Sequence, residues 1–197
     1  MKKVLFIILI LTQITSVFSQ TKKQDFGFEL RYPIPIGNNS LPKSYYGIID
    51  IGMDYSFIHI KNCGIGILLN SSFLIHPQGG ASMVILSPKI KIDYEISMDK
   101  ISIIPMVAFG YSNWRTQSNF MGYSSHSSMH GLTLKGATKV VFKSDKKMNW
   151  YLLFAYEFTQ LEKPGYNVYG SMDTNYNRIR QILYPGVGMI WKFNTSK

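Results

Sequence analysis

Apolar and polar residues alternate one by one along eight separate segments of this chain. In the stretch KIKIDYEI of residues 89–96, for example, every second residue is apolar. A period of two is that of a β-strand, whereas an amphipathic helix repeats its apolar residues every three or four positions. The pattern therefore predicts an all-β fold. Its expected strands are residues 26–36, 45–58, 63–73, 83–96, 101–112, 130–142, 150–159 and 179–193.

The links between these segments alternate in length. Those after the first, third, fifth and seventh segments are longer than those after the second, fourth and sixth, and the longest two are residues 113–129 and 160–178. Bacterial outer-membrane barrels have an even number of strands, short periplasmic turns and longer outer loops. We therefore expect an eight-stranded antiparallel, up-and-down transmembrane β-barrel in the outer membrane, with both termini in the periplasm.

A soluble, lipocalin-like periplasmic binding barrel is the alternative, because it would turn the apolar face inward and alternation alone does not distinguish the two. Three features favour the membrane. Only 16% of the residues are charged, where soluble domains have about 25%. The polar face is rich in Gly, Ala and Ser. The apolar face has rings near the strand ends, as interfacial girdles require. These girdle candidates are Phe26, Tyr32, Tyr45, Phe57, Tyr94, Tyr111, Trp150, Trp191 and Phe193.

The polar face carries charges of both signs in equal number. Its acidic residues are Glu29, Asp50, Asp54, Asp93, Glu95 and Glu157, and its basic residues are Arg31, Lys89, Lys91, Lys135, Lys139 and Lys192. Eight strands enclose a lumen just wide enough for side chains to fill, and an unpaired buried charge is costly. We therefore expect a structural ion-pair network rather than a general porin. A slow proton or ion path along Glu29, Arg31, Asp93 and Lys91 is the alternative.

Residues 1–19 have the features of a signal peptide. Two lysines precede the apolar run VLFIILIL, and Ser19 offers a small residue before the cut. The run is much shorter than the ~20 residues of a transmembrane helix. We expect residues 20–197 to form one barrel domain. The formal net charge is +10, but an exported chain without a dense basic run argues against nucleic acid as a partner.

The apolar N-terminus, the eight alternating segments and the closing stretch GVGMIWKF of residues 186–193 together resemble small outer-membrane barrels of Gram-negative bacteria. The nearest resemblance is to the "outer membrane protein beta-barrel domain", or PorT-like, group, and OmpA- and OmpX-type barrels are more distant. The resemblance implies a monomer inserted by the barrel-assembly machinery, in contact with outer-membrane lipid and lipopolysaccharide. It also implies an alternative role as an accessory component of a secretion or transport assembly.

Catalysis needs a nucleophile, a base and a group that orients the base. His126 and Ser128 resemble the His-x-Ser pair of lipid A deacylases, but Glu157, a nearby carboxylate, belongs to the inward face. His126 and His130 are two imidazoles without acidic help, which is too little for a metal site. We expect no enzymatic activity, no cofactor and no metal. A lipid-modifying enzyme is kept as the less favoured alternative.

The expected outer loops combine aromatic rings with Asn, Ser and Gly, a composition common in recognition surfaces. The recognition candidates are Trp114, Arg115, Phe120, Tyr123, Tyr166, Tyr169 and Tyr176. Arg115 could also meet lipopolysaccharide phosphates through charge-assisted hydrogen bonds. Loop solvation and membrane anchoring are the simpler explanation of the same residues. The expected function is structural, or interaction at the cell surface through an unknown partner.

Overall fold

The computed structural model describes residues 23–120, 123–144, 147–162 and 178–194. The expected signal peptide, residues 1–19, lies outside them, and so does the expected start of the barrel domain at residue 20.

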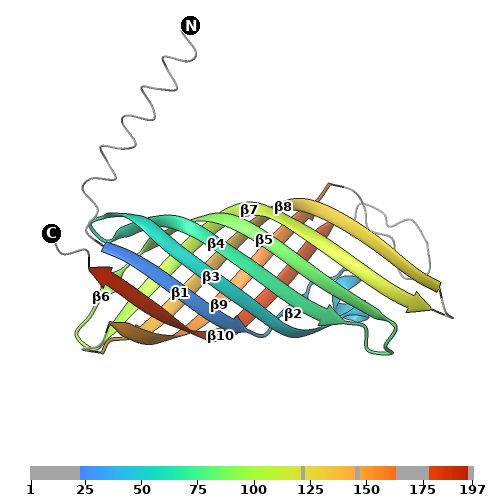
Figure 1. Ribbon diagram of the computed structural model, residues 1–197, viewed down its shortest axis with the longest axis horizontal. Helices are drawn as coiled ribbons and strands as arrows, with labels where there is room; N and C mark the ends of the chain where they lie inside the picture. The colour runs from blue at the N-terminus through green and yellow to red at the C-terminus, as the bar shows by residue number, and fades with distance from the viewer. Residues whose placement is uncertain (1–22, 121–122, 145–146, 163–177, 195–197) are drawn as a thin grey trace, which may run out of the picture.

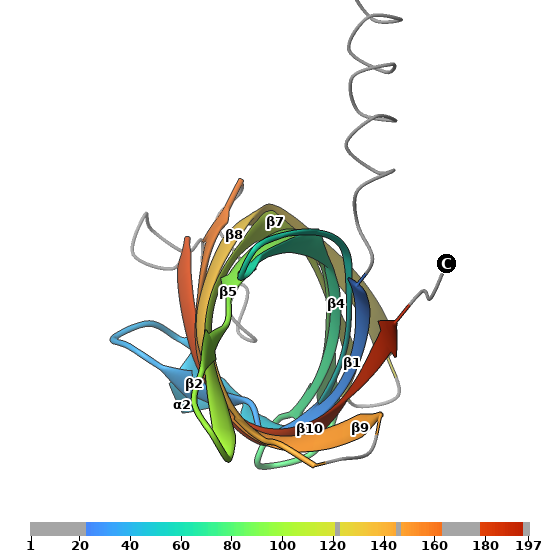
Figure 2. The same ribbon diagram turned by 90° about the vertical axis from the view of Figure 1, so that its left-hand side faces the viewer.

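Eight antiparallel strands form a closed barrel, which confirms the predicted fold class (Figures 1 and 2). Each strand pairs with the next, and the last pairs with the first, so that Lys23 lies opposite Asn194. The barrel strands are β1 (Lys23–Arg31), β3 (Tyr46–Ile60), β4 (Cys63–Ile75), β5 (Ala81–Tyr94), β7 (Ile101–Phe120), β8 (Tyr123–Phe142), β9 (Met148–Leu161) and β10 (Ile179–Asn194).

Three short elements complete the described chain: β2 (Ile34–Ile36), α2 (Leu41–Ser44) and β6 (Ile96–Ser97). The expected first strand is interrupted after Arg31, and its continuation β2 pairs only with β10. Pro33 and Pro35 lie in this stretch. Proline has no N–H for a ladder and is tolerated at an edge, which explains why the segment cannot pair on both sides.

The two ends of the barrel differ. One end holds both barrel termini and the links after β3, β5 and β8, and the other holds α2, the link after β4 and the tip of the β7–β8 hairpin (Figure 1). Barrels of this class keep their short turns and their termini on the periplasmic side. The end with α2 therefore faces outward.

The β7–β8 hairpin is the largest departure from the sequence-based expectation. Residues 113–129 were expected to form a long loop, but β7 and β8 pair continuously from Ile101 with Phe142 to Phe120 with Tyr123. The hairpin runs past the other strands at the outer end (Figure 1). In its outer part, residues 124–128 read SSHSS, with polar residues at successive positions. Without alternation between faces, this part of the sequence had the composition of a loop.

The barrel wall has an apolar exterior and a largely polar interior. On β5, for example, Ile90 is 65% exposed and its neighbour Lys91 only 3%. The outward residues are mainly Ile, Leu, Val, Phe and Tyr. A bilayer has no water to satisfy backbone groups, so closed barrels with such an exterior are one of the two structures that span it. Among the described residues, no helix is long and apolar enough to cross a membrane.

Candidate functional site

Arg31 is at the centre of the ion pairs inside the barrel. Its Nη1 lies 2.9 Å from Glu29 Oε2, and its Nη2 contacts Asp50 Oδ1. All three side chains are fully buried. Ser72 donates a hydrogen bond to Asp50 from the neighbouring strand β4. The Arg31 guanidinium thus joins two acids that come from β1 and β3.

Lys139 reaches across the lumen from β8. Its Nζ lies 2.8 Å from Glu29 Oε1 and 2.8 Å from Asp54 Oδ2. Lys91 contacts Asp54 Oδ1 and lies 2.9 Å from Asp93 Oδ2. One continuous network therefore joins β1, β3, β5 and β8, and it ties the two halves of the barrel together.

Two further lysines have different surroundings. Lys89 Nζ lies 3.1 Å from Glu157 Oε2, which joins β5 to β9 across the lumen. Lys135, also fully buried, forms no ion pair with a described carboxylate. Its Nζ lies 4.9 Å from the centre of the Tyr184 ring. In the amide orientation that satisfies its neighbours, Asn70 accepts a hydrogen bond from Lys135 Nζ at 2.7 Å.

The periplasmic end of the lumen holds the remaining predicted pair. Lys192 Nζ lies 3.1 Å from Glu95 Oε1, which also accepts a hydrogen bond from Ser102 at 2.9 Å. Both charged side chains keep some contact with solvent. The structure thus places all twelve of the predicted inward charges on the inner face, and eleven of them form ion pairs there.

Trp114 was expected in an outer loop, and this was wrong. It lies on β7 with no exposed surface, inside the outer part of the barrel. Buried apolar side chains from β4, β5, β9, β10 and α2 belong to the same cluster: Leu74, Ile85, Leu161, Ile182 and Leu41. This apolar layer lies between the ion-paired interior and the outer mouth. Trp114 therefore contributes to packing and is not available to a partner.

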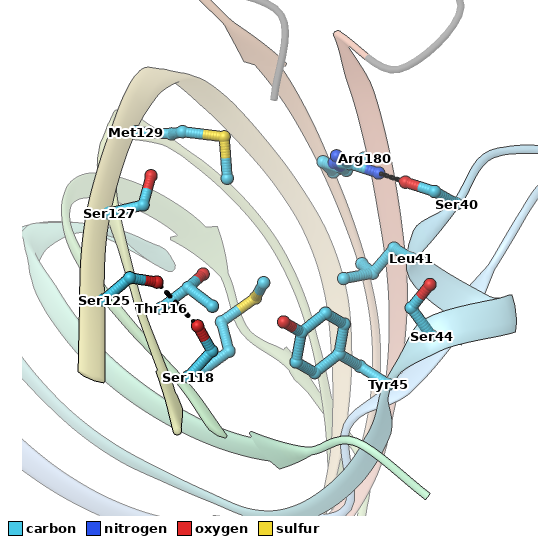
Figure 3. A pocket seen from close by; sticks show the side chains of 11 residues that line it. Ser40, Leu41, Ser44, Tyr45, Thr116, Ser118, Ser125, Ser127, Met129 and Arg180 are labelled. Carbon is cyan, nitrogen blue, oxygen red and sulfur yellow. Dashed lines mark hydrogen bonds between the residues drawn. The ribbon is translucent and has the colours of Figure 1, made fainter. Parts of the chain in front are cut away.

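A polar cavity of about 170 Å³ lies at the outer mouth (Figure 3). Tyr45 lines it and is 7% exposed, so its expected place in the aromatic girdle was wrong. Tyr45 is the residue between the helical turn α2 and strand β3. The other lining residues are Ser40, Leu41, Ser44, Met83, Thr116, Ser118, Ser125, Ser127, Met129 and Arg180.

Arg180 lies on one side of this cavity with Ser40, and the hairpin serines Ser118, Ser125 and Ser127 lie on the opposite side (Figure 3). Arg180 Nη1 donates to Ser40 Oγ at 2.9 Å and lies 3.4 Å from Asn39 Oδ1. Ser118 and Ser125 share a hydrogen bond of 2.7 Å across the β7–β8 hairpin. Burial raises the pKa of Tyr45 above its usual value, so its hydroxyl stays protonated.

The outer face of the hairpin carries the residues considered for catalysis. His126 lies opposite Gln117, and Ser128 lies opposite Arg115. These four residues line one shallow groove together with Ser82, Val84, Leu86, Thr116 and Ser127, and none of its described lining residues is acidic. Within the described part of the groove, the His126–Ser128 pair therefore has no carboxylate to orient the base.

Most of the girdle candidates lie on the outside as expected from alternation. Trp150 is 55% exposed, and the rings of Phe26 and Trp191 pack with their centres 5.9 Å apart. The other candidates that are exposed or half-exposed are Tyr32, Phe57, Tyr94, Tyr111 and Phe193.

Of the loop candidates, Arg115 is exposed on β7. Phe120 and Tyr123 lie at the ends of β7 and β8, and Tyr166, Tyr169 and Tyr176 lie outside the described residues.

The described part of the chain has no group of three or more His, Cys, Asp or Glu side chains placed to hold a metal ion. His126 and His130, the pair considered for a metal, both lie on the outer face of β8. The His130 ring stacks on Tyr111 at 6.1 Å between ring centres. Its position is explained by this packing.

Three solved structures share this architecture. Ail, the attachment invasion locus protein of Yersinia pestis, has a TM-score of 0.54 and 11% identity over 88% of this chain and all of its own. A major outer membrane protein from Thermus thermophilus has a TM-score of 0.53 and 11% identity, over 86% of this chain and 99% of its own. Neisserial surface protein A (NspA) has a TM-score of 0.51 and 12% identity, over 87% of this chain and 96% of its own. The fold is that of a small outer-membrane β-barrel.

This fold, with an apolar exterior that only a bilayer can cover, places the protein in the outer membrane. No family model and no curated protein matches the sequence. The PorT-like resemblance therefore has no support beyond the general architecture. At identities of 11–12%, the similarity to solved structures shows the fold alone.

Three interior residues were missed by the sequence reasoning. Asp25 Oδ2 lies 3.2 Å from His59 Nε2 near the periplasmic end, and Arg180 lies in the mouth cavity. Asp25 lies one residue before the expected first strand, and Arg180 lies within the expected last strand, so alternation extended to these two positions would have placed both inward. His59 follows a β-bulge between Ser56 and Ile58. A bulge adds one residue and reverses the alternation after it, so no simple pattern shows that His59 faces inward.

Proposed function

We propose that this protein is a non-enzymatic outer-membrane barrel that binds a protein partner at the cell surface. In this proposal the partner adds a β-strand to the outer edge of β8, where the β7–β8 hairpin extends beyond the barrel. The signal peptide, insertion by the barrel-assembly machinery and a monomeric state belong to the same proposal. The observation that carries it is the outer edge of β8, with which no strand of the described residues pairs beyond Gly131.

That edge is defined by the pairing of β8. Strand β9 pairs with β8 only from Gly131 to Phe142, whereas β7 pairs with it along its whole length. In the described part of the chain, no strand pairs with the outer edge of residues 123–130. An exposed edge presents backbone N–H and C=O groups to another strand.

The direction of these backbone groups follows from one hydrogen bond. The N–H of Glu162, just after β9, donates to the carbonyl of His130 at 2.9 Å. In an antiparallel ladder, alternate residues direct both backbone groups to the same side. The N–H and C=O groups of Ser124, His126 and Ser128 therefore point away from β7, toward the position that an added strand would take.

The composition of the edge fits recognition through the main chain. Residues 125–128 are exposed, and their side chains are those of three serines and one histidine. They offer no apolar anchor, and addition of a strand to a sheet edge obtains its affinity mainly from backbone hydrogen bonds. The interior network below holds β8 in place through Lys139. The edge is therefore presented on a rigid support.

Lipopolysaccharide contact is the second part of the proposal. Arg115 is exposed on the outer face of β7, four residues further out than the exposed Tyr111. A guanidinium at this level suits a phosphate, because its planar donors match phosphate oxygens. In the same groove lie Val84, which is opposite Arg115 on β5, and Leu86, and both suit an acyl chain.

Proline substitution tests the edge. In cells that make the double variant His126→Pro, Ser128→Pro, two outward N–H groups are removed without a loss of pairing to β7. We expect attachment of these cells to a panel of immobilised surface and matrix proteins to fall about tenfold or more. Each lost backbone hydrogen bond costs ~1 kcal/mol, and the proline rings also hinder the approach of an added strand. His126→Ala, Ser128→Ala is the matched control and keeps the wild-type attachment.

Two results would contradict the proposal. If the proline variant keeps the wild-type attachment, the partner does not use this edge. Attachment that is the same with and without the protein, combined with a secretion defect in the strain that lacks it, would favour the alternative role in a secretion assembly.

A further inference from the structure

Three lysines gather at the periplasmic end of β7, β8 and β9. Lys100 directly precedes β7, Lys143 directly follows β8, and Lys147 directly precedes β9. Strand β8 lies between the other two, and the N–H of Lys143 donates to the carbonyl of Lys100 at 3.0 Å. Both turns lie at the end of the barrel that holds the termini (Figure 1). These three lysines are called the basic cluster.

The charges of the basic cluster are not used in ion pairs. Lys100 and Lys147 are exposed, and neither forms an ion pair with a described carboxylate. The Nζ of Lys143 donates to Ser97 Oγ at 2.5 Å and to the carbonyl of Met98. Both acceptors are neutral, so these hydrogen bonds hold the side chain in place without cancelling its charge.

The acids at this end of the barrel are too few to neutralise the basic cluster. Asp99 is the one exposed acid among the described residues of the periplasmic end. The other acids near this end face the lumen and are paired there with His59, Lys91 and Lys192: Asp25, Asp93 and Glu95. Asp99 compensates at most one of the three lysines, so an excess of positive charge remains.

The wall beside the basic cluster shows how deep it lies in the membrane. Ile101 on β7, Phe142 on β8 and Trp150 on β9 lie opposite one another in the ladder. Phe142 is 47% exposed and Trp150 is 55% exposed on the outer face, and such rings lie at the headgroup level. A strand rises about 3.3 Å per residue, and the lysines follow these positions by one to three residues. The basic cluster therefore lies within roughly 10 Å of the rings.

We propose that the basic cluster binds an anionic phospholipid in the inner leaflet of the outer membrane. The lysines meet the negatively charged headgroup, and the acyl chains lie against Phe142 and Trp150. Phospholipid covers this part of the wall in any case, so the cluster selects the charge of the headgroup. An acidic protein of the periplasm has the same charge complementarity, but the depth of the cluster favours the lipid. The site is at the opposite end of the barrel from the β8 edge and does not depend on it.

Trp150 can report which lipid lies beside the basic cluster. It is the remaining tryptophan in the variant Trp114→Phe, Trp191→Phe, and a brominated acyl chain quenches it on contact. This chain is refolded into vesicles of phosphatidylcholine and phosphatidylglycerol at one fixed composition, with bromine on one lipid or on the other. We expect phosphatidylglycerol to contact Trp150 at least about fivefold more often than its share of the bilayer predicts, because lysines near the surface attract anionic headgroups. High salt should lower this preference, since it screens exposed charges.

Two substitutions locate the site without removing a side-chain contact. In the same single-tryptophan chain, Lys100→Gln with Lys147→Gln is expected to lower the preference to about twofold or less. Lys43→Gln with Lys61→Gln is the matched control. It also removes two exposed charges, one in α2 and one between β3 and β4, which do not pair with β7, β8 or β9. The control is expected to keep the full preference.

Two further measurements separate lipid binding from folding. Gel migration before and after boiling shows whether each variant is folded. In vesicles of phosphatidylcholine alone, replacement of Lys100 or Lys147 should leave the free energy of unfolding nearly unchanged, since no anionic headgroup is present there.

Three results would overturn the proposal. The first is equal contact of the two lipids with Trp150 when all three lysines are present, which would leave an acidic protein as the occupant. The second is a preference that survives in the folded Lys100→Gln, Lys147→Gln variant. The third is a preference that the control loses to the same extent, which would show a general effect of net charge.

Discussion

Lys135 and Lys139 show how differently two buried lysines on one strand are held. Both face the lumen from β8, four residues apart, and neither exposes more than 3% of its side chain. Lys139 has two carboxylates at 2.8 Å, whereas Lys135 has an amide oxygen and the Tyr184 ring. The same substitution at the two positions should therefore have different effects.

Lys139→Met is expected to destabilise the barrel strongly. It leaves Glu29 and Asp54 facing each other in the lumen without the cation between them, and breaking a buried pair from one side costs about 3–5 kcal/mol. The free energy of unfolding by urea in lipid vesicles measures this. Lys147→Met, at an exposed position in the periplasmic turn, is the control and should change it by less than about 0.5 kcal/mol.

Lys135→Met is expected to change the same free energy by no more than about 1 kcal/mol. An apolar side chain of similar length fills the space, and no buried carboxylate loses a direct ion pair. A loss as large as that of Lys139→Met would show that Lys135 supports the acids of the network at longer range.

Alternation along the strands was enough to place the twelve charged residues on one face of the sheet, because successive side chains of a strand point to opposite faces, and the features that favour a membrane barrel made that face the inner one. It could not say which charges would meet. Lys139 and Asp54 are 85 residues apart, and their contact depends on how far each strand is shifted along its neighbours around the whole barrel. That shift is a property of the closed structure.

Gly66 on β4 shows what a bulge requires of the neighbouring strand. At this position a side chain would begin 2.0 Å from the carbonyl oxygen of Tyr55, next to the bulge that follows Ser56 on β3. Gly136 on β8 has nothing within 4 Å of the same point. Both glycines lie on strands of the same barrel, so they form a matched pair.

Gly66→Ala is expected to lower the free energy of unfolding by about 1–3 kcal/mol, the usual cost of forced overpacking. Gly136→Ala should leave it unchanged or raise it by up to about 1 kcal/mol, since alanine has less freedom to lose on folding. Urea unfolding of both variants in vesicles checks the pair. Equal effects would mean that the carbonyl of Tyr55 can move away at little cost.

At the scale of elements, the sequence predicted all eight barrel strands but not how far the β7–β8 hairpin extends. Within the membrane, lipid and lumen impose opposite chemistry on the two faces, so the pattern is strong. Beyond the membrane, both faces of the hairpin meet water or a polar cavity, and residues 124–128 read SSHSS. Nothing in that stretch marks a strand, and the extended hairpin was therefore mistaken for a loop.

The whole molecule rests on one inversion relative to a soluble barrel: the apolar face points outward and the charges point inward. The closed ladder, the ion-paired lumen and the apolar layer near the mouth all depend on this orientation. The chain has three tryptophans, and they lie on both sides of the wall. Trp150 and Trp191 are on the outer face, whereas Trp114 is buried inside.

The most direct test uses three variants that each keep one tryptophan, with the other two replaced by phenylalanine. Each is refolded into vesicles that contain brominated phospholipid, which quenches only tryptophans in contact with lipid. We expect Trp150 and Trp191 to be quenched and Trp114 to keep its fluorescence. Quenching of Trp114 without that of Trp150 and Trp191 would contradict the inside-out arrangement, and absence of all quenching in a water-soluble protein would contradict the membrane barrel itself.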